Sequence, residues 1–302
     1  MTDINDPKKH HYVPQFYLRK FSCPDESNKV PTLSRHTPYL IKKRNSISRI
    51  GYEDNLYKVT DENIELCVER NINLAIETPI SQSETWRKID EGKPELLNKG
   101  DKLLIYIFMR HLESRNLEML EFMKSEQARI KNSKYQKEYS DEGRRMYDQI
   151  GSTHQGANYF YLNMSSNIDQ YLEEYKRASI TIFGSSIPIR TSTNPVINVP
   201  MHTFQNRYFN PNEMTKWLPL SPRFGAMLYL NDNNCDFGSF QVVEKDVIKV
   251  LNRLYLCQLL NSRTTRHMIV NDEYLFNDFE WSGLKVDPLN PRKFRWSSSK
   301  VQ

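Results

Sequence analysis

The order of helix-type and strand-type patterns along the chain restricts the fold more than any other feature of the sequence. Apolar residues recur at helical spacing through residues 103–123, and weaker helical patterns cover residues 63–80 and 163–178. Short runs rich in Val, Ile, Leu and Tyr, separated by turn residues, fill residues 30–60 and 179–230. We therefore expect an α+β fold, with a central helical bundle and short, mainly antiparallel strands in the N-terminal and C-terminal parts.

Domain organisation follows from the lack of breaks in the pattern. No internal repeat and no clean linker divides the 302 residues, so a single α+β domain is predicted over residues 1–280. It includes a last helix from about residue 243 to His267. Residues 281–302 combine Asp-Pro and Asn-Pro turns with basic and Ser-rich sequence. A loosely ordered basic tail is expected there.

Composition excludes several classes of protein. Aromatic residues make up 12% of the chain, which is too many for a disordered protein. The four cysteines have no CxxC spacing, which argues against a zinc ribbon or a disulfide framework. No apolar run approaches the roughly 18–20 residues of a membrane helix, and the polar, acidic start does not resemble a secretory signal. We expect a cytoplasmic protein that does not enter a membrane.

The positive charge is concentrated near the start of the chain. Residues 1–50 hold ten Lys/Arg and four Asp/Glu, whereas the remaining residues hold 32 and 33. A local excess of this kind favours a polyanionic partner such as nucleic acid, or a nucleotide. A solvated basic edge without a partner is the alternative.

The densest group of potentially reactive side chains lies in residues 8–21 (KKHHYVPQFYLRKF). A short helix is predicted over residues 15–21, because Pro14 is tolerated at a helix start. His10 and His11 are expected in a loop just before this helix, where both can face one pocket and backbone N–H groups attract anions. Histidine titrates near neutrality, so either one is a candidate catalytic acid or base. Packing or capping at the helix entry is the alternative.

Acidic and basic residues of the predicted helices are candidate partners for these histidines. Glu77 is flanked by apolar residues and is a candidate to orient a catalytic histidine; an ordinary surface carboxylate is the alternative. Arg110 and Arg115 lie on a strongly apolar helix and are candidate phosphate ligands. An internal salt bridge to Glu65 or Glu77 is the other interpretation. His111 and Arg115 are four residues apart and therefore share one helix face.

A third candidate segment follows a predicted strand. Ser192 and Asn194 lie in a turn before Pro195, a position suited to a binding loop at a sheet edge. An Asx-type turn without a ligand explains the same residues. The chain has no GxSxG, P-loop or GxGxxG sequence. No local HxH or HExxH supplies a metal site, so no cofactor is predicted, and a divalent metal remains an alternative.

Three segments together resemble the DUF4238 family of uncharacterised bacterial proteins. Residues 9–21 match the HHxVPxxYLxxF opening of the family, and the middle helices carry Ile-Glu pairs followed by Arg110 and Arg115. Residues 191–196 (TSTNPV) precede LPLSP at residues 218–222, and Thr193 stands where the family usually has Asp. The resemblance covers roughly residues 9–265. It implies a bacterial protein compatible with a phage-defence or toxin-like role.

These features predict a nuclease-like hydrolase that acts on phosphodiesters or nucleotides. In this hypothesis His10 or His11 performs acid–base chemistry beside Glu77, while Arg110 and Arg115 hold the anion. The alternative is a non-catalytic module that binds nucleic acid or protein, with the His-His and aromatic stretch as a structural plug. A cleft that contains the histidines, Glu77 and Arg115 would favour the enzyme.

Overall fold

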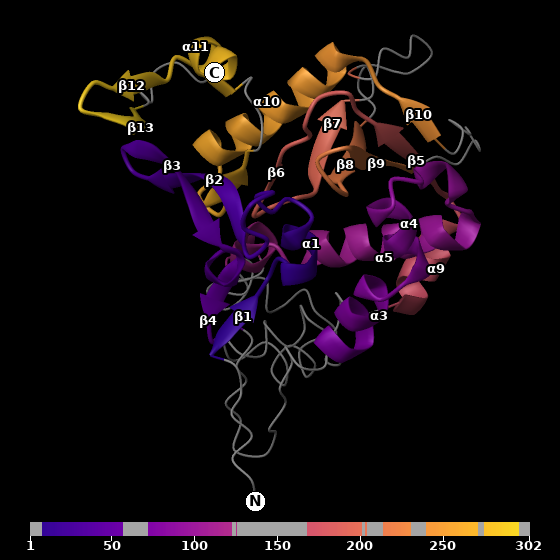
Figure 1. The fold of residues 1–302 in the computed structure, drawn as a ribbon. Helices are drawn as coiled ribbons and strands as arrows, with labels where there is room; N and C mark the ends of the chain where they lie inside the picture. The colour runs from indigo at the N-terminus through magenta and orange to yellow at the C-terminus, as the bar shows by residue number, and fades with distance from the viewer. Residues whose placement is uncertain are drawn as a thin grey trace, which may run out of the picture.

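The computed structural model describes residues 8–56, 72–122, 125, 168–200, 203, 214–230, 240–270 and 275–295. These residues form two large β-sheets, a small two-stranded sheet and helices on both sides of the sheets (Figure 1). The fold class is therefore α+β, as the sequence predicts.

The largest sheet has six strands in the order β12-β13-β3-β2-β11-β6, and its neighbouring strands are antiparallel. The strands are β2 (Lys29–His36), β3 (Tyr39–Ser46), β6 (Thr191–Ser192), β11 (His267–Ile269), β12 (Lys285–Asp287) and β13 (Asn290–Arg295). Strands β2 and β3 pair along their whole length, which makes this hairpin the centre of the sheet.

The C-terminal strands of this sheet differ from the expected loosely ordered tail. Residues 285–295 form the β12–β13 hairpin, and β13 pairs with β3. Phe294 is buried, and its ring lies 4.2 Å from that of Phe279 in α11 (Leu275–Ser282). This aromatic contact anchors the hairpin, while the Pro288-Leu289 pair forms its turn. Turn residues were therefore signs of a hairpin here, and not of disorder.

The second sheet has five strands in the order β10-β5-β9-β8-β7, antiparallel except for the β10–β5 pair. Its strands are β5 (Ala178–Gly184), β7 (Ile197–Pro200), β8 (Met214–Pro219), β9 (Phe224–Leu230) and β10 (Phe240–Val242). The two-stranded sheet joins β1 (Lys9–His11) to β4 (Tyr52–Asp54).

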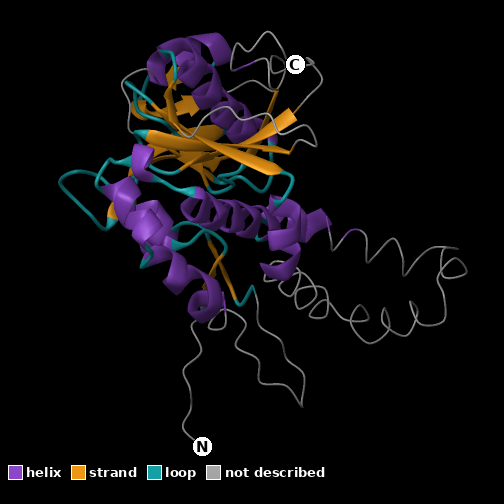
Figure 2. Cartoon of the chain, turned by 90° about the vertical axis from the view of Figure 1, so that its right-hand side faces the viewer, coloured by secondary structure: helices purple, strands orange, loops and turns teal. Residues whose placement is uncertain are grey.

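The helices surround the sheets. They are α1 (Gln15–Arg19), α3 (Thr78–Ser81), α4 (Glu84–Asp90), α5 (Lys99–Ser114), α9 (Ile168–Tyr175), α10 (Lys245–Asn261) and α11. Figure 2 shows strands between helices on either side, so a central helical bundle is not confirmed. Helix α10 also ends earlier than predicted, and His267 lies in β11, where it pairs with β2. Residues 271–274 and the predicted helical residues 63–71 lie outside the described part of the chain.

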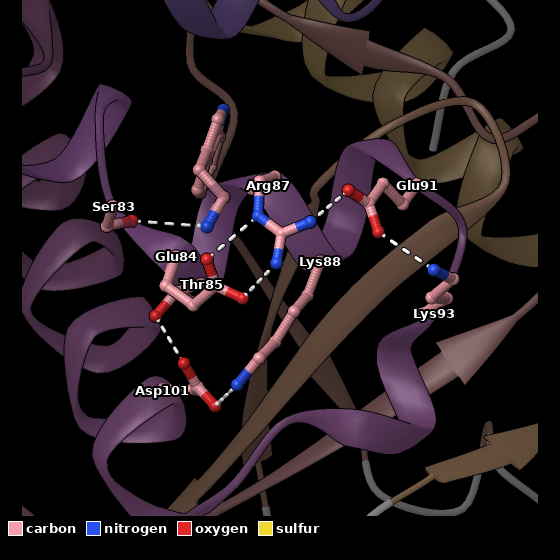
Figure 3. A network of polar contacts seen from close by, with 9 residues as sticks. Ser83, Glu84, Thr85, Arg87, Lys88, Glu91, Lys93 and Asp101 are labelled. Carbon is pink, nitrogen blue, oxygen red and sulfur yellow. Dashed lines mark hydrogen bonds and ion pairs between the residues drawn. The ribbon is translucent and has the colours of Figure 1, made fainter.

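Polar side chains fix the junction between α4 and α5 (Figure 3). Asn98 and Asp101 form a capping box at the start of α5. The Asp101 carboxylate also accepts hydrogen bonds from Thr85 at 2.6 Å and from Lys88 at 2.7 Å. These contacts between the two helices hold α4 against the first turn of α5.

The aromatic residues of the opening stretch belong to the core beneath the sheets. Tyr12, Tyr17, Leu18 and Phe21 are all at most 2% exposed and pack with residues of α4 and α5. The Tyr17 hydroxyl lies 2.6 Å from Thr191 Oγ1 in β6. The opening stretch therefore connects the helical layer to the six-stranded sheet, in agreement with its interpretation as a packing element.

Candidate functional site

A pocket of about 240 Å³ lies between α1 and the helical segment that precedes α4. Its lining residues come from two short stretches of chain: His11, Gln15, Phe16 and Arg19 on one side, and Asn73, Glu77, Thr78 and Ser81 on the other. On each side the polar positions follow at intervals of four residues, the spacing that puts side chains on one face of a helix. The pocket is therefore lined mainly by polar groups.

The β1–β4 pair places His11 at this pocket. His11 pairs with Tyr52, and the ring centroids of these two residues are 5.7 Å apart. The next two backbone N–H groups, of Tyr12 and Val13, donate to the Gly51 carbonyl. Gly51 has φ of +66°, and a Cβ there would press on Val13, so only glycine fits this turn. These contacts hold the chain rigidly just before α1.

His10 and His11 do not share the pocket, contrary to the expected loop. Both lie in β1, where successive side chains point to opposite faces. Only His11 lines the pocket, while His10 is buried opposite Glu53 on the other side. The three-residue strand was too short to give an alternating pattern in the sequence.

The surroundings of His11 favour its neutral form. Burial lowers the pKa of His11, and although the Glu77 carboxylate raises it, Arg115 and Lys9 add to the lowering. Gln15 Nε2 lies 3.3 Å from His11 Nε2. When this amide donates, Nε2 is the unprotonated nitrogen of the ring, and it can take a proton in place of this hydrogen bond.

Glu77 lies at the bottom of a buried ion-pair cluster with His111 and Arg115. The Arg115 guanidinium donates to the Glu77 carboxylate, to His111 Nε2 at 3.0 Å and to the backbone carbonyl of His11. Burial alone would raise the pKa of Glu77, but the charges and hydrogen bonds of Arg115 and His111 together outweigh burial and hold this pKa below its usual range. The predicted salt bridge between Arg115 and Glu77 is thus present, whereas Glu65 lies outside the described residues.

The helical segment that carries Glu77 is irregular. A π-helical turn over Asn73–Glu77 leads directly into α3, so the helical path continues through Pro79. Pro79 lies in the first turn of α3, where its missing N–H is tolerated. Wider turns of this kind are frequent at functional sites, and this one brings Glu77 to the pocket.

Arg19 is the cation that lines the pocket, and Arg115 is not accessible there. Arg115 is 1% exposed and fully engaged within the cluster. Arg19 is exposed, and no carboxylate among the described residues pairs with it. Arg19 was not among the predicted site residues, although its spacing of four from Gln15 in the predicted helix puts both side chains on one face.

Arg110 belongs to a different network. Its guanidinium contacts Glu113 at 2.6 Å and Glu174 at 3.1 Å, and Glu113 also pairs with Lys216 of β8. Arg110 and Arg115 are five residues apart, and therefore about 140° apart around α5. The structure does not bring Arg110 to the pocket.

Ser192 and Asn194 form a buried turn away from the pocket. Ser192 Oγ accepts from the Asn194 backbone N–H at 3.0 Å and donates to Gln258 Oε1 at 2.7 Å. The Asn194 side chain donates to Glu118 Oε2 at 3.2 Å. Thr193, at the family's usual Asp position, accepts from the backbone N–H of His267 at 3.3 Å. The turn is thus closed by the Ser192 hydroxyl and is not the Asx-type alternative, because Asn194 Oδ1 has no hydrogen-bond partner among the described residues.

Ion pairs neutralise part of the basic region at the start of the chain. The cations with carboxylate partners are Lys8 (with Asp54), Lys20 (with Asp90), Lys29 (with Glu26) and Arg44 (with Asp25 and Glu26). The excess of positive charge near the surface is therefore smaller than the sequence count of the first fifty residues indicates.

Metal ligands and membrane spans were searched within the described ranges. No three His, Cys, Asp or Glu residues there are placed to hold a metal ion. Of the helices in these ranges, none combines the length and the apolar character needed to cross a membrane.

Comparison with known proteins gives one match. The model of a family described as "Protein of unknown function (DUF4238)" matches residues 9–272. No curated protein and no solved structure matches the chain. The matched residues include the pocket, the ion-pair cluster and the buried turn at Ser192.

Proposed function

The chain belongs to the DUF4238 family, and from its pocket we propose that it is a hydrolase of phosphodiesters or nucleotides in which His11 is the general base. The observation that carries this proposal is the meeting of three different groups at one small pocket. A histidine in its neutral form, a carboxylate held ionised and an exposed guanidinium all line it.

Each of these groups has a role in such a reaction. His11 takes a proton from a water molecule as the water oxygen attacks phosphorus, the bond between phosphorus and the leaving ester oxygen breaks, and the leaving oxygen takes up a proton from solvent. Arg19 binds the negative oxygens of the substrate and the charge that develops on them. Glu77 stabilises the imidazolium that forms, since its negative charge already favours protonated His11. Arg115 is a positioning residue, because it holds both Glu77 and the His11 carbonyl.

The size of the pocket supports a small reacting group. A volume of about 240 Å³ is below the roughly 300–1,000 Å³ of pockets that enclose whole drug-sized ligands. A phosphate with its immediate ester oxygens fits such a space, and the rest of a nucleotide or strand would extend outside. Gln15 and Ser81 supply polar contacts at the wall.

The proposal is tested by hydrolysis of nucleotides, single-stranded RNA and DNA, and bis(p-nitrophenyl) phosphate, with and without Mg²⁺ or Mn²⁺. The expected result is turnover that His11→Gln reduces by about 10²–10⁴-fold, the contribution of a general base. Arg19→Gln is expected to raise KM. His10→Gln is the matched control, because it changes the neighbouring histidine on the opposite face of β1.

Two results would contradict this assignment. One is activity that survives in His11→Gln at the wild-type rate. The other is a complete lack of turnover by folded wild-type protein on every substrate of the panel. Melting temperatures of all variants accompany the assay, so that loss of the fold is not mistaken for loss of chemistry.

A further inference from the structure

On one face of the six-stranded sheet, strands β3, β13 and β12 carry a group of four basic side chains and one aromatic side chain around Ile41. Residues directly opposite each other in antiparallel strands share a face. Tyr39 of β3 lies opposite Arg295 of β13, and Arg295 lies opposite Lys285 of β12. On the same face, Lys293 and Lys43 occupy neighbouring rows. We call these five residues the basic sheet face.

The opposite face of these strands is covered. Leu33, Leu40 and Phe294 are at most 1% exposed and pack with residues of α10 and α11. Figure 1 shows both helices along one side of these strands. Over β3, β13 and β12 the basic sheet face points outward, since Lys43, Lys285 and Arg295 are exposed and the other two members are half-buried. The same face of the sheet is closed at β2, where Thr32 and Ser34 are buried.

The cations of this face have no acidic partners within the described residues. No ion pair there involves Lys43, Lys285, Lys293 or Arg295. Lys29 and Arg44 of the same hairpin, in contrast, form ion pairs with carboxylates. The only carboxylate in the sequences of β2, β3, β12 and β13 is Asp287, which accepts the Leu289 backbone N–H at 2.9 Å.

The positive charge of this face lowers the pKa of two histidines beside it. His36 pairs with Tyr39, and burial together with Lys43 lowers the pKa of His36. Burial, Lys43, Arg266 and His36 lower the pKa of His267 to about 4. His267 Nδ1 lies 2.8 Å from Ser34 Oγ, inside the sheet face. The two histidines are therefore neutral beside cations that have no acidic partner, and an anionic ligand would compensate this positive charge.

We propose that the basic sheet face binds single-stranded nucleic acid. Four cations without acidic partners match the repeated charge of a phosphate backbone. Tyr39 adds an aromatic ring on which an unpaired base can stack, and Lys293 Nζ lies 5.7 Å from the centre of this ring. The bases of a duplex are stacked on one another and cannot stack on Tyr39, so this face should prefer a single strand. The face shares no residue with the pocket, so the inference does not depend on the proposed catalysis.

Binding is measured by fluorescence anisotropy with labelled oligo-U RNA and oligo-dT DNA of about 12 nucleotides, within the range of single-strand binding sites. His11→Gln protein is used beside wild type, so that turnover cannot consume the probe. Salt titrations are expected to show weaker binding at higher salt. Lys43→Gln/Lys293→Gln should reduce the slope of log K against log[salt] by about 1.4, at roughly 0.7 for each lost phosphate contact.

Three comparisons separate this site from general attraction of polyanions. Lys99→Gln/Lys249→Gln removes the same charge elsewhere, on α5 and α10, and should leave the slope unchanged. Tyr39→Leu should weaken binding about tenfold, as expected for one lost stacking contact, and Tyr39→Phe should restore it. Duplex DNA and a polyglutamate peptide serve as competing probes.

The inference is overturned by any of four outcomes. These are no binding of either oligonucleotide, equal slopes for the two double variants, no effect of Tyr39→Leu, or tighter binding of the duplex or the acidic peptide. Because the basic sheet face and the pocket share no residue and have separate assays, failure here leaves the proposal for the pocket untouched.

Discussion

Replacing Arg115 by Met tests the ion-pair cluster on which the pocket rests. The guanidinium is 1% exposed and donates to the Glu77 carboxylate, to His111 Nε2 and to the His11 carbonyl. Methionine keeps much of the volume but offers no donor. The variant therefore leaves a carboxylate, 12% exposed, without its counter-charge.

The expected loss is about 3–5 kcal/mol in the free energy of unfolding, the usual effect of removing one partner of a buried ion pair. Glu77→Gln should also be strongly destabilising, because it leaves the buried Arg115 charge without its carboxylate partner. The double variant Arg115→Met/Glu77→Gln should lose only about 1–3 kcal/mol, since no buried charge remains and only hydrogen bonds are missing. Each single variant should thus lose more free energy of unfolding than the double variant.

The difference between wild type and Arg115→Met should depend on pH. In wild type the pKa of Glu77 is held below 4.5, so its stabilising contribution is present above that value and is lost as the pH falls through the lower folded pKa. In the variant Glu77 keeps its burial and its contact with His111 but loses the charge and hydrogen bond of Arg115, so its pKa rises and its ionised form becomes less favourable. Acidification relieves that cost, so the difference in stability should shrink as the pH falls from neutrality towards 4.5.

Chemical denaturation, followed by tryptophan fluorescence and far-UV circular dichroism, measures these values. Arg87→Met is the matched control, because Arg87 also contacts two carboxylates but is exposed, and it should change stability very little. The reasoning fails if Arg115→Met costs no more than Arg87→Met. It also fails if the single losses simply add in the double variant, or if the difference from wild type is constant with pH.

Two other contacts give predictions for stability. The pKa of His267 is lowered to about 4 from the usual 6.5, so His267 binds a proton more readily in the unfolded chain. The free energy of unfolding should therefore fall by up to about 3 kcal/mol as the pH falls from 6.5 to 4. His267→Asn should flatten this part of the stability profile, and an unchanged slope would contradict the assignment. Tyr17→Phe should cost about 1–2 kcal/mol, because Thr191 Oγ1 loses a buried partner at 2.6 Å. Tyr175→Phe, whose hydrogen bond is exposed, should cost less in the same denaturation experiment.

Local patterns in the sequence predicted most of the regular structure. The apolar spacing that predicted a helix after residue 100 belongs to α5, whose buried residues include Ile105, Phe108 and Leu112. The strand-type runs correspond to β2, β3, β5, β8 and β9. These elements were predictable because each buries one face and therefore repeats its apolar residues with its own period. The C-terminal hairpin was missed because it has a single buried aromatic residue, Phe294.

The candidate site was only partly predictable, because its residues meet through contacts between distant segments. Sequence spacing linked His111 to Arg115, and an ion pair to Glu77 was one of two interpretations. Nothing local indicated that Arg115 would also bind the backbone carbonyl of His11, more than a hundred residues away. Likewise, the sequence favoured a ligand-binding loop at Ser192 and Asn194, but Ser192 Oγ bonds within the turn and to Gln258 of α10.

The position of Arg115 couples the pocket to the fold. The same guanidinium holds the Glu77 carboxylate and the carbonyl of His11, so the proposed base and the carboxylate beside it have a common support. A change at Arg115 should therefore reduce stability and turnover together, because it shifts both walls of the pocket. Arg19 lines the same pocket but is exposed, so Arg19→Gln should affect KM with little change in stability. If both variants lowered stability equally, Arg19 would be a structural residue, and the pocket would lose its proposed anion ligand.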